Sequence, residues 1–214
     1  MPSTPSQSEI LAFAKWFCEE RIETFEKDMR ICMTADGQGR HAYMPALMAC
    51  ASFIELFAGL HAGKVSSVGI SNILKFTNRY LEATEFTEEL ICIFFEMFRH
   101  KVAHVTRPYS VFDSHDVSTN NPLRNYPQRR LTWRITASYQ KPSIQIIAKV
   151  GNIKRTRRPQ WKSAAYSHIC KVNLKRMIKQ LQGAITGQNG YLNSLSIESD
   201  IRRNFVICMD SFYP

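Results

Sequence analysis

Residue types suited to acid–base and phosphate chemistry close the apolar segment 90–104. Arg99 and His100 are adjacent, and His104 follows five residues after Arg99. An imidazole accepts or releases a proton near neutral pH. A guanidinium holds a phosphate group through two parallel hydrogen bonds. This spacing indicates a candidate site for chemistry on a phosphate, at the end of a helix.

A carboxylate elsewhere in the chain is a candidate partner for the guanidinium. Glu55 is the only acid in the apolar segment 42–60. It could pair with Arg99 and fix the orientation of that side chain. The alternative is that Glu55 reaches the edge of the bundle and faces water.

Glu96 is the second candidate for an orienting role. Glu96, His100 and His104 also stand at i, i+4 and i+8, so an α-helix places them in a row on one face. Such a row could bind a metal ion. No further Cys, His or Asp grouping supports a metal site, so we expect no metal and no cofactor.

Helices are predicted to precede and position this site, because apolar residues recur at helical spacing. Ser8 is the predicted N-cap of the first helix, and Gly63 is expected to end the second. Pro108 is expected to prevent the last from continuing. The predicted helices cover residues 7–33, 43–61, 69–82 and 87–104.

The second half of the chain changes pattern. Residues 107–130 are polar and contain three prolines, which is typical of a long loop. Apolar residues then alternate with polar ones over 131–138 and again over 144–150, which predicts a β-hairpin with a four-residue loop. A basic connection and two helices are expected to follow, over residues 151–162, 164–185 and 197–209.

The predicted fold class is mainly α: a four-helix bundle followed by a β-hairpin and one or two C-terminal helices. Residues 1–107 would form the bundle, and residues 108–214 a basic C-terminal extension packed on it as one compact unit. The segment 42–60 is almost long enough to cross a membrane. Its central carboxylate and its alanine content favour a buried core helix over a membrane span.

The helical half resembles the HEPN superfamily (higher eukaryote and prokaryote nucleotide-binding). Its signature is Arg-x(4–6)-His at the end of the last core helix, often with Asn, Asp or His directly after the Arg. Arg99, His100 and His104 match that pattern, and the resemblance covers roughly residues 7–107. It implies a HEPN-like four-helix bundle and a metal-independent endoribonuclease that cuts RNA through the neighbouring 2′-hydroxyl.

The resemblance also implies roles for the motif residues. His104 would be the general base or acid, Arg99 the phosphate clamp, and His100 would orient them or share the proton transfer. Five residues on an ideal α-helix separate two side chains by roughly 140°. Arg99 and His104 therefore converge on one phosphate only if the helix loosens near His104, or if a second subunit completes the site. HEPN proteins commonly dimerise through this cleft, so we expect a homodimer.

The basic residues of the chain gather in its second half. The chain has 28 Lys and Arg and 18 Asp and Glu, a net charge of +10. Residues 1–100 hold 9 basic and 13 acidic residues, and residues 101–214 hold 19 and 5. This asymmetry indicates contact with a polyanion, RNA being the expected partner, and the alternative is a solvated basic surface. The candidate RNA-binding residues are Arg107, Arg124, Arg129, Arg130, Lys154, Arg155, Arg157, Arg158 and Lys162.

The cellular setting follows from cysteine usage and the N-terminus. None of the six cysteines forms a CxxC pair, and the polar residues 1–8 do not resemble a signal peptide. We therefore expect a reduced, cytoplasmic protein with no membrane contact. A toxin or defence effector with an antitoxin or other regulatory protein would fit the resemblance. The alternative function is a non-catalytic HEPN-like module for RNA binding or dimerisation.

Overall fold

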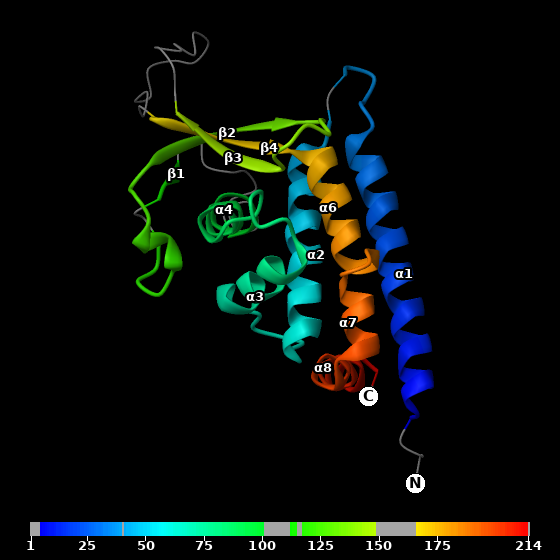
Figure 1. The fold of residues 1–214 in the computed structure, drawn as a ribbon. Coiled ribbons are helices and arrows are strands. Elements are labelled where there is room, and N and C mark those ends of the chain that lie inside the picture. Colours follow the sequence, from blue (N-terminus) through cyan, green and yellow to red (C-terminus); the bar gives the residue numbers. More distant parts are fainter. Residues whose placement is uncertain (1–4, 40, 101–111, 115–116, 149–165, 214) are drawn as a thin grey trace.

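A bundle of helices with a four-stranded sheet across one end makes up the structure (Figure 1). The computed structural model describes residues 5–39, 41–100, 112–114, 117–148 and 166–213. Helices α1 (Gln7–Met33) and α2 (Tyr43–Ala62) pack against each other along the bundle. Both match the predicted ranges to within one residue. The mainly helical class is confirmed by the structure.

The N-cap of the first helix lies two residues before the predicted one. Ser6, not Ser8, is the N-cap: its hydroxyl accepts a hydrogen bond from the Glu9 amide, and the Glu9 carboxylate accepts one from the Ser6 amide at 2.7 Å. This reciprocal capping box satisfies two amides that a single Ser8 cap would leave unpaired. The end of α2 is as predicted, because Gly63 adopts the left-handed conformation that stops the helix.

Two shorter helices follow on the other side of α2. Helix α3 (Ile70–Tyr80) contacts α2 and lies within the predicted range. Helix α4 (Glu88–Phe94) is capped by the Thr87 hydroxyl and continues as a π-helical turn, η1 (Phe95–His100). A single helix was predicted over 87–104. In its described part, which ends at residue 100, the chain is α-helical and then π-helical.

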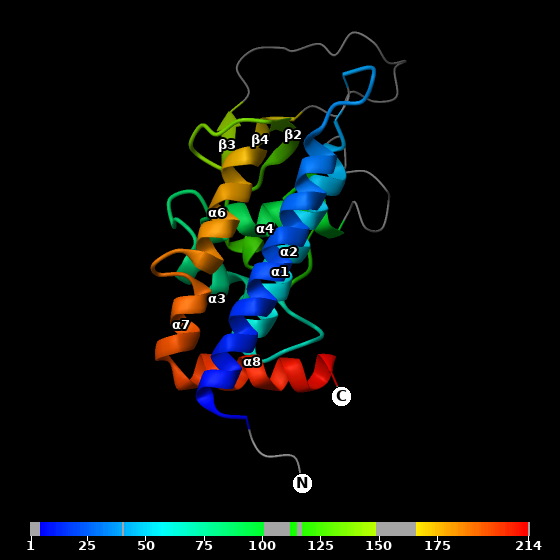
Figure 2. The same cartoon turned by 90° about the vertical axis from the view of Figure 1, so that its right-hand side faces the viewer.

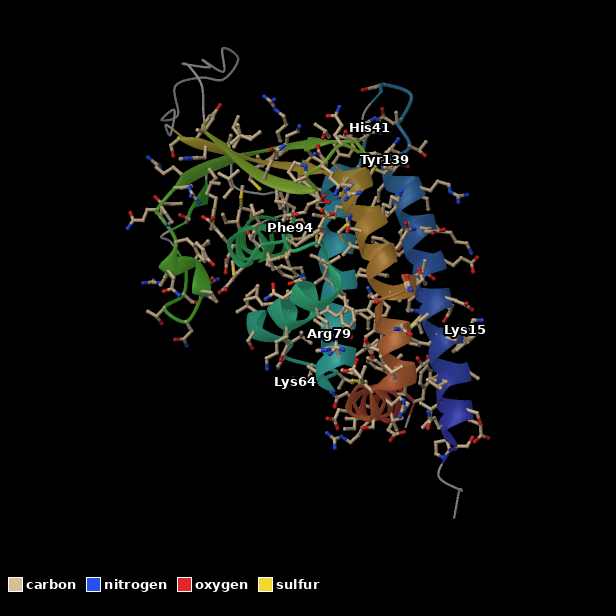
Figure 3. All side chains as sticks on the ribbon, viewed as in Figure 1. Lys15, His41, Lys64, Arg79, Phe94 and Tyr139 are labelled. Atoms are coloured by element: carbon tan, nitrogen blue, oxygen red, sulfur yellow. The ribbon has the colours of Figure 1, made fainter. Side chains whose placement is uncertain are left out.

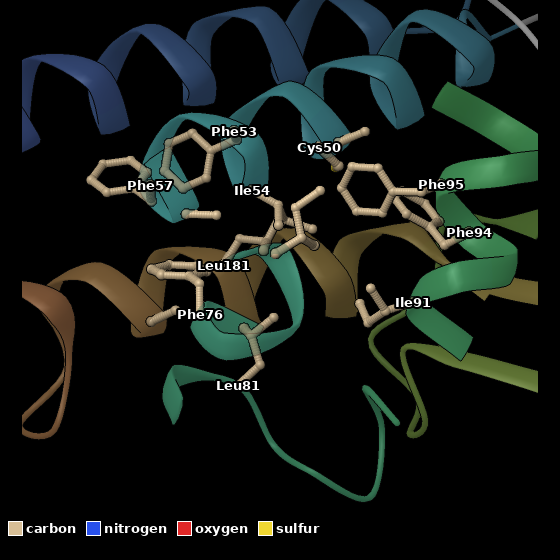
Figure 4. Packing of buried hydrophobic residues seen from close by; sticks show 14 of the residues in the cluster. Cys50, Phe53, Ile54, Phe57, Phe76, Leu81, Ile91, Phe94, Phe95 and Leu181 are labelled. Atoms are coloured by element: carbon tan, nitrogen blue, oxygen red, sulfur yellow. The ribbon is translucent and has the colours of Figure 1, made fainter. Parts of the chain in front are cut away.

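Helix α2 is the centre of the core. Its Phe53, Ile54 and Phe57 are buried between α1, α3 and α6, and Figure 4 shows Ile54 between Phe57 on one side and Phe95 of η1 on the other. The packing explains why α2 carries so few polar residues. By length and composition this helix could cross a membrane, but 56% of its most apolar window is buried inside the protein. Such burial is that of a core helix.

The sheet contradicts the predicted hairpin. It contains β1 (Phe112–Asp113), β2 (Arg130–Thr136), β3 (Ile144–Ala148) and β4 (His168–Asn173), in the order β1-β2-β4-β3. Strands β2 and β3 exist as predicted, but β4 lies between them, parallel to β2 and antiparallel to β3.

The connection between β2 and β3 explains this order. It runs over residues 137–143, which is longer than the tight loop of a hairpin. Buried Asn173, at the end of β4, holds it in place by donating from Nδ2 to the carbonyl oxygens of Gln140 (3.0 Å) and Pro142 (2.6 Å). The chain therefore crosses the end of β4 before β3 pairs with its far edge.

The C-terminal helices are also partly different from the prediction. The expected helix over 164–185 is strand β4 followed by α6 (Leu174–Thr186), and the weaker helix over 197–209 is α7 (Tyr191–Ile197) and α8 (Ser199–Phe212). These helices contact α1 and α2 (Figures 1 and 2), so they form part of the bundle. One continuous cluster of buried residues joins the two predicted segments.

A buried ion pair connects the helices to the sheet. Glu85 lies between α3 and α4 with a 3% exposed side chain, and it accepts hydrogen bonds from Arg176 of α6 (2.9 Å) and from the Ser143 amide (2.8 Å) and hydroxyl (2.6 Å). Burial acts to raise the pKa of Glu85, but these hydrogen bonds outweigh it and lower that pKa from 4.5 to about 2. Glu85 is therefore a charged anchor for this corner of the fold.

Candidate active site at the end of the fourth helix

Arg99 projects from the π-helical turn towards α2. Its Nε donates a hydrogen bond of 2.9 Å to Oε2 of Glu55, so, of the two alternatives for Glu55, the pair with Arg99 is present. The two side chains keep 32% and 24% of their surface exposed. Within the described part of the chain, the terminal guanidinium nitrogens of Arg99 donate to no residue. Arg99 is thus held at one nitrogen and retains donors for a ligand.

The packing of η1 fixes where Arg99 can point. Phe95, Met97 and Phe98 of this turn are almost fully buried, whereas Glu96 and Arg99 are half-buried. The large side chains hold most of the turn inside the core and leave the two charged residues at its rim. π-Helical turns have i→i+5 hydrogen bonds and occur frequently at functional sites.

Glu96 contacts the loop that precedes β2. Its Oε1 accepts a hydrogen bond of 2.7 Å from Nδ2 of Asn121. Asn121 is also the N-cap of the 3₁₀ segment η2 (Pro122–Asn125), where its Oδ1 accepts from the Leu123 amide at 2.9 Å. The hydrogen bond of Glu96 therefore positions the loop that precedes β2. Orientation of the motif by Glu96 stays a prediction.

The other motif residues are only partly covered by the structure. His100 ends η1, and its backbone alone is described. His104 and Arg107 lie outside the described residues. Across the described ranges, no group of three or more His, Cys, Asp and Glu side chains is placed to hold a metal ion.

Three of the candidate RNA-binding arginines make contacts within the protein. Arg124 donates from Nε to the carbonyl oxygens of Val117 (3.0 Å) and Ser118 (2.9 Å). Arg129 pairs with Glu89 of α4, and Arg130 lies 3.9 Å from Asp113 of β1. These contacts fasten the loop and the start of β2 to the rest of the fold. The remaining candidates, outside the described residues, are Lys154, Arg155, Arg157, Arg158 and Lys162.

Two hollows of the described surface are lined by residues other than Arg99 and Glu55. One hollow, of about 440 Å³, lies between the start of α4 and the edge strand β3, and Thr87, Arg129 and His168 line it. The other, of about 600 Å³, lies at the turn between α1 and α2. At the candidate site, the half-buried side chains of Glu96 and Arg99 lie at the rim of the core.

Comparison of the chain with protein-family models, with curated proteins and with solved structures finds no significant match.

Proposed function

We propose that the protein is a metal-independent, HEPN-like endoribonuclease. The observation that carries this proposal is the Arg99–Glu55 pair, which holds a guanidinium at the rim of the core directly before His100 and five residues before His104. A half-buried arginine with free donors suits a phosphate whose charge grows in the transition state.

In the proposed reaction, the 2′-hydroxyl of one nucleotide attacks the phosphate that links it to the next. A bond forms between the 2′-oxygen and phosphorus, and the bond from phosphorus to the 5′-oxygen breaks. His104 takes the proton from the 2′-hydroxyl or gives one to the leaving 5′-oxygen, and His100 orients the motif or shares the transfer. Arg99 binds the phosphate oxygens throughout. The products are a 2′,3′-cyclic phosphate and a free 5′-hydroxyl.

The π-helical turn supports this arrangement. Side chains five residues apart diverge on an α-helix, whereas i→i+5 hydrogen bonding brings them close to one face. The turn Phe95–His100 is π-helical up to the residue after Arg99, and a continuation of this winding to His104 would bring the two side chains towards one face. A homodimer would supply the remaining convergence, with two copies of the motif at one cleft. Sedimentation equilibrium at micromolar concentration should then show a dimer, and a monomer alone would contradict it.

The biological setting is part of the same proposal. A cytoplasmic ribonuclease of this kind would act as a toxin or defence effector, and it would need an antitoxin or another regulatory protein to hold it inactive.

The test is cleavage of single-stranded RNA in the presence of EDTA. The wild type should produce 2′,3′-cyclic phosphate ends, and Arg99→Ala and His104→Ala should each abolish them. Background cleavage that is equal in all three proteins would exclude the nuclease and leave the alternative, a non-catalytic RNA-binding or dimerisation module. Loss of wild-type activity on chelation would instead indicate a metal enzyme.

A further inference from the structure

The charges of the second half are distributed unevenly in space as well as in sequence. Residues 117–197 contain fifteen Lys and Arg and no Asp or Glu. Carboxylates from other parts of the chain compensate several of these cations: Glu89 pairs with Arg129, and Glu82 and Glu85 pair with Arg176. Cations without a carboxylate partner among the described residues are therefore the candidates for binding an anionic ligand.

Two such cations are direct neighbours on the sheet. Arg134 of β2 and Lys171 of β4 are register partners on parallel strands, so their side chains share one face. Neither forms an ion pair or a hydrogen bond with another described residue. Like charges in adjacent positions destabilise a sheet unless an anion lies between them.

This face of the sheet is the one turned away from the core. Side chains of the opposite face, such as Cys170 and Val172, are buried, and Trp133 packs against the same core. On the outer face, Arg134 and Ile147 are exposed. The two cations therefore stand beside accessible apolar surface.

An aromatic ring lies just beyond the same end of β2 and β4. Tyr139 is 66% exposed, and the Lys175 ammonium sits 5.4 Å from the centre of its ring. Both residues follow the strand ends at Thr136 and Asn173, and Figure 3 shows Tyr139 where α6 meets the sheet. An exposed ring with cations beside it is a platform on which an unpaired base stacks while its phosphate is neutralised.

We infer that Arg134 and Lys171 on the outer face of the sheet, together with Lys175 and Tyr139 just beyond the ends of β2 and β4, bind the backbone and one unpaired base of single-stranded RNA. The inference rests on the proposed function, because it names the surface that holds the same RNA outside the cleavage site. It also assigns substrate binding to residues different from Arg124, Arg129 and Arg130. Lys171 and Arg134 contact phosphates, and Tyr139 stacks on the base.

The experiment measures binding of a fluorescein-labelled, single-stranded 2′-O-methyl oligoribonucleotide by anisotropy. This probe lacks the free 2′-hydroxyl and cannot be cut, so binding is read independently of cleavage. The Arg134→Ala/Lys171→Ala variant should bind at least about tenfold more weakly, and the slope of log K against log salt should fall by about 0.7 per lost contact. Tyr139→Ala should weaken binding at least about fivefold, and wild type should prefer this strand to its duplex.

The matched control is Lys64→Ala/Lys75→Ala, which removes two exposed lysines from the helical half. Lys64 lies at the opposite end of the molecule from Tyr139 (Figure 3), so this variant should bind as wild type does. Arg134→Gln/Lys171→Gln removes both charges but keeps longer, polar side chains, so it guards against a folding defect in the alanine variant. Unchanged binding in both Arg134/Lys171 double variants would overturn the inference. Binding that is weakened equally in the Lys64→Ala/Lys75→Ala control would also overturn it.

Two further outcomes separate this inference from its rivals. Tighter binding of poly-glutamate than of the oligonucleotide, lost in the same variants, would assign the surface to an acidic protein and overturn the RNA assignment. If wild type binds the probe but cuts no RNA, the proposed nuclease fails while the surface stands. If wild type cuts RNA but the double variants bind normally, the surface alone is wrong.

Discussion

Two of the arginine–carboxylate pairs that join distant parts of this chain differ in their surroundings. In the Glu85–Arg176 pair the side chains are 3% and 14% exposed, and both oxygens of the carboxylate accept hydrogen bonds. In the Glu55–Arg99 pair they are 24% and 32% exposed, and one hydrogen bond joins them.

The difference separates an anchor from a candidate site. Nε and Nη2 of Arg176 both donate to carboxylates, and breaking the pair with Glu85 leaves a charge in a largely buried position. A guanidinium held by one nitrogen at the rim of the core is oriented and still able to bind phosphate. We therefore assign Glu85–Arg176 to stability and Glu55–Arg99 to function.

The largest expected effect is on folding. Glu85→Ala leaves Arg176 half-paired in a buried position, so it should lower the free energy of unfolding by about 3 kcal/mol. Glu55→Ala breaks a more exposed pair and should cost less than about 1 kcal/mol. Urea unfolding at neutral pH measures both, and equal losses would erase the distinction between the two pairs.

The second prediction concerns the free energy of unfolding at low pH. The pKa of Glu85 is lowered from 4.5 to about 2 in the folded protein, so its contribution is complete above pH 4.5 and is lost as the pH falls towards 2. The loss should amount to roughly 3 kcal/mol. Unfolding free energies of wild type and Glu85→Gln should therefore converge over this range, and curves that stay parallel would contradict the role of the charge.

A smaller effect is expected on cleavage. Glu55→Gln keeps the size of the side chain but weakens the hydrogen bond that orients Arg99, so the cleavage rate should fall roughly tenfold, about 1.4 kcal/mol in the barrier. The midpoint of thermal unfolding should change little. A rate equal to that of wild type would show that Arg99 needs no orienting partner.

The smallest effect is expected at the engaged arginines of the second half. Arg124→Gln should change RNA affinity less than about twofold, because its guanidinium already donates to the carbonyl oxygens of Val117 and Ser118. Anisotropy with the same oligonucleotide checks this value. A loss as large as that of Arg134→Ala/Lys171→Ala would return Arg124 to the RNA-binding surface.

Local patterns predicted the first three helices and offered one contact of the site as an alternative. The long helix Gln7–Met33 follows from helical spacing and capping residues, which are local in the chain. The Glu55–Arg99 pair was one of two alternatives, because a single acid in an apolar helix either pairs with a cation or reaches water at the edge of the bundle. Its hydrogen bond is present, and its catalytic role stays a prediction.

The order of the sheet depends on pairing that no local pattern encodes. Strand β4 has only six residues and runs directly into α6 with no Gly or Pro between them, so it was predicted to be the first turns of a basic helix. The hydrogen bonds that place it between β2 and β3 come from Asn173 to a distant loop. The π-helical turn also depends on contacts between distant parts of the chain, because Phe95 and Phe98 are buried where the turn packs against α2.

The most direct test of the assignment compares two half-exposed arginines. Arg79 pairs with Glu198 on another side of the bundle, and its side chain is 40% exposed, so Arg79→Ala matches Arg99→Ala in chemistry and exposure. Single-turnover cleavage of RNA in EDTA should fall at least about 100-fold in Arg99→Ala and less than about twofold in Arg79→Ala, with both proteins folded. Equal rates in Arg99→Ala and wild type would contradict the account.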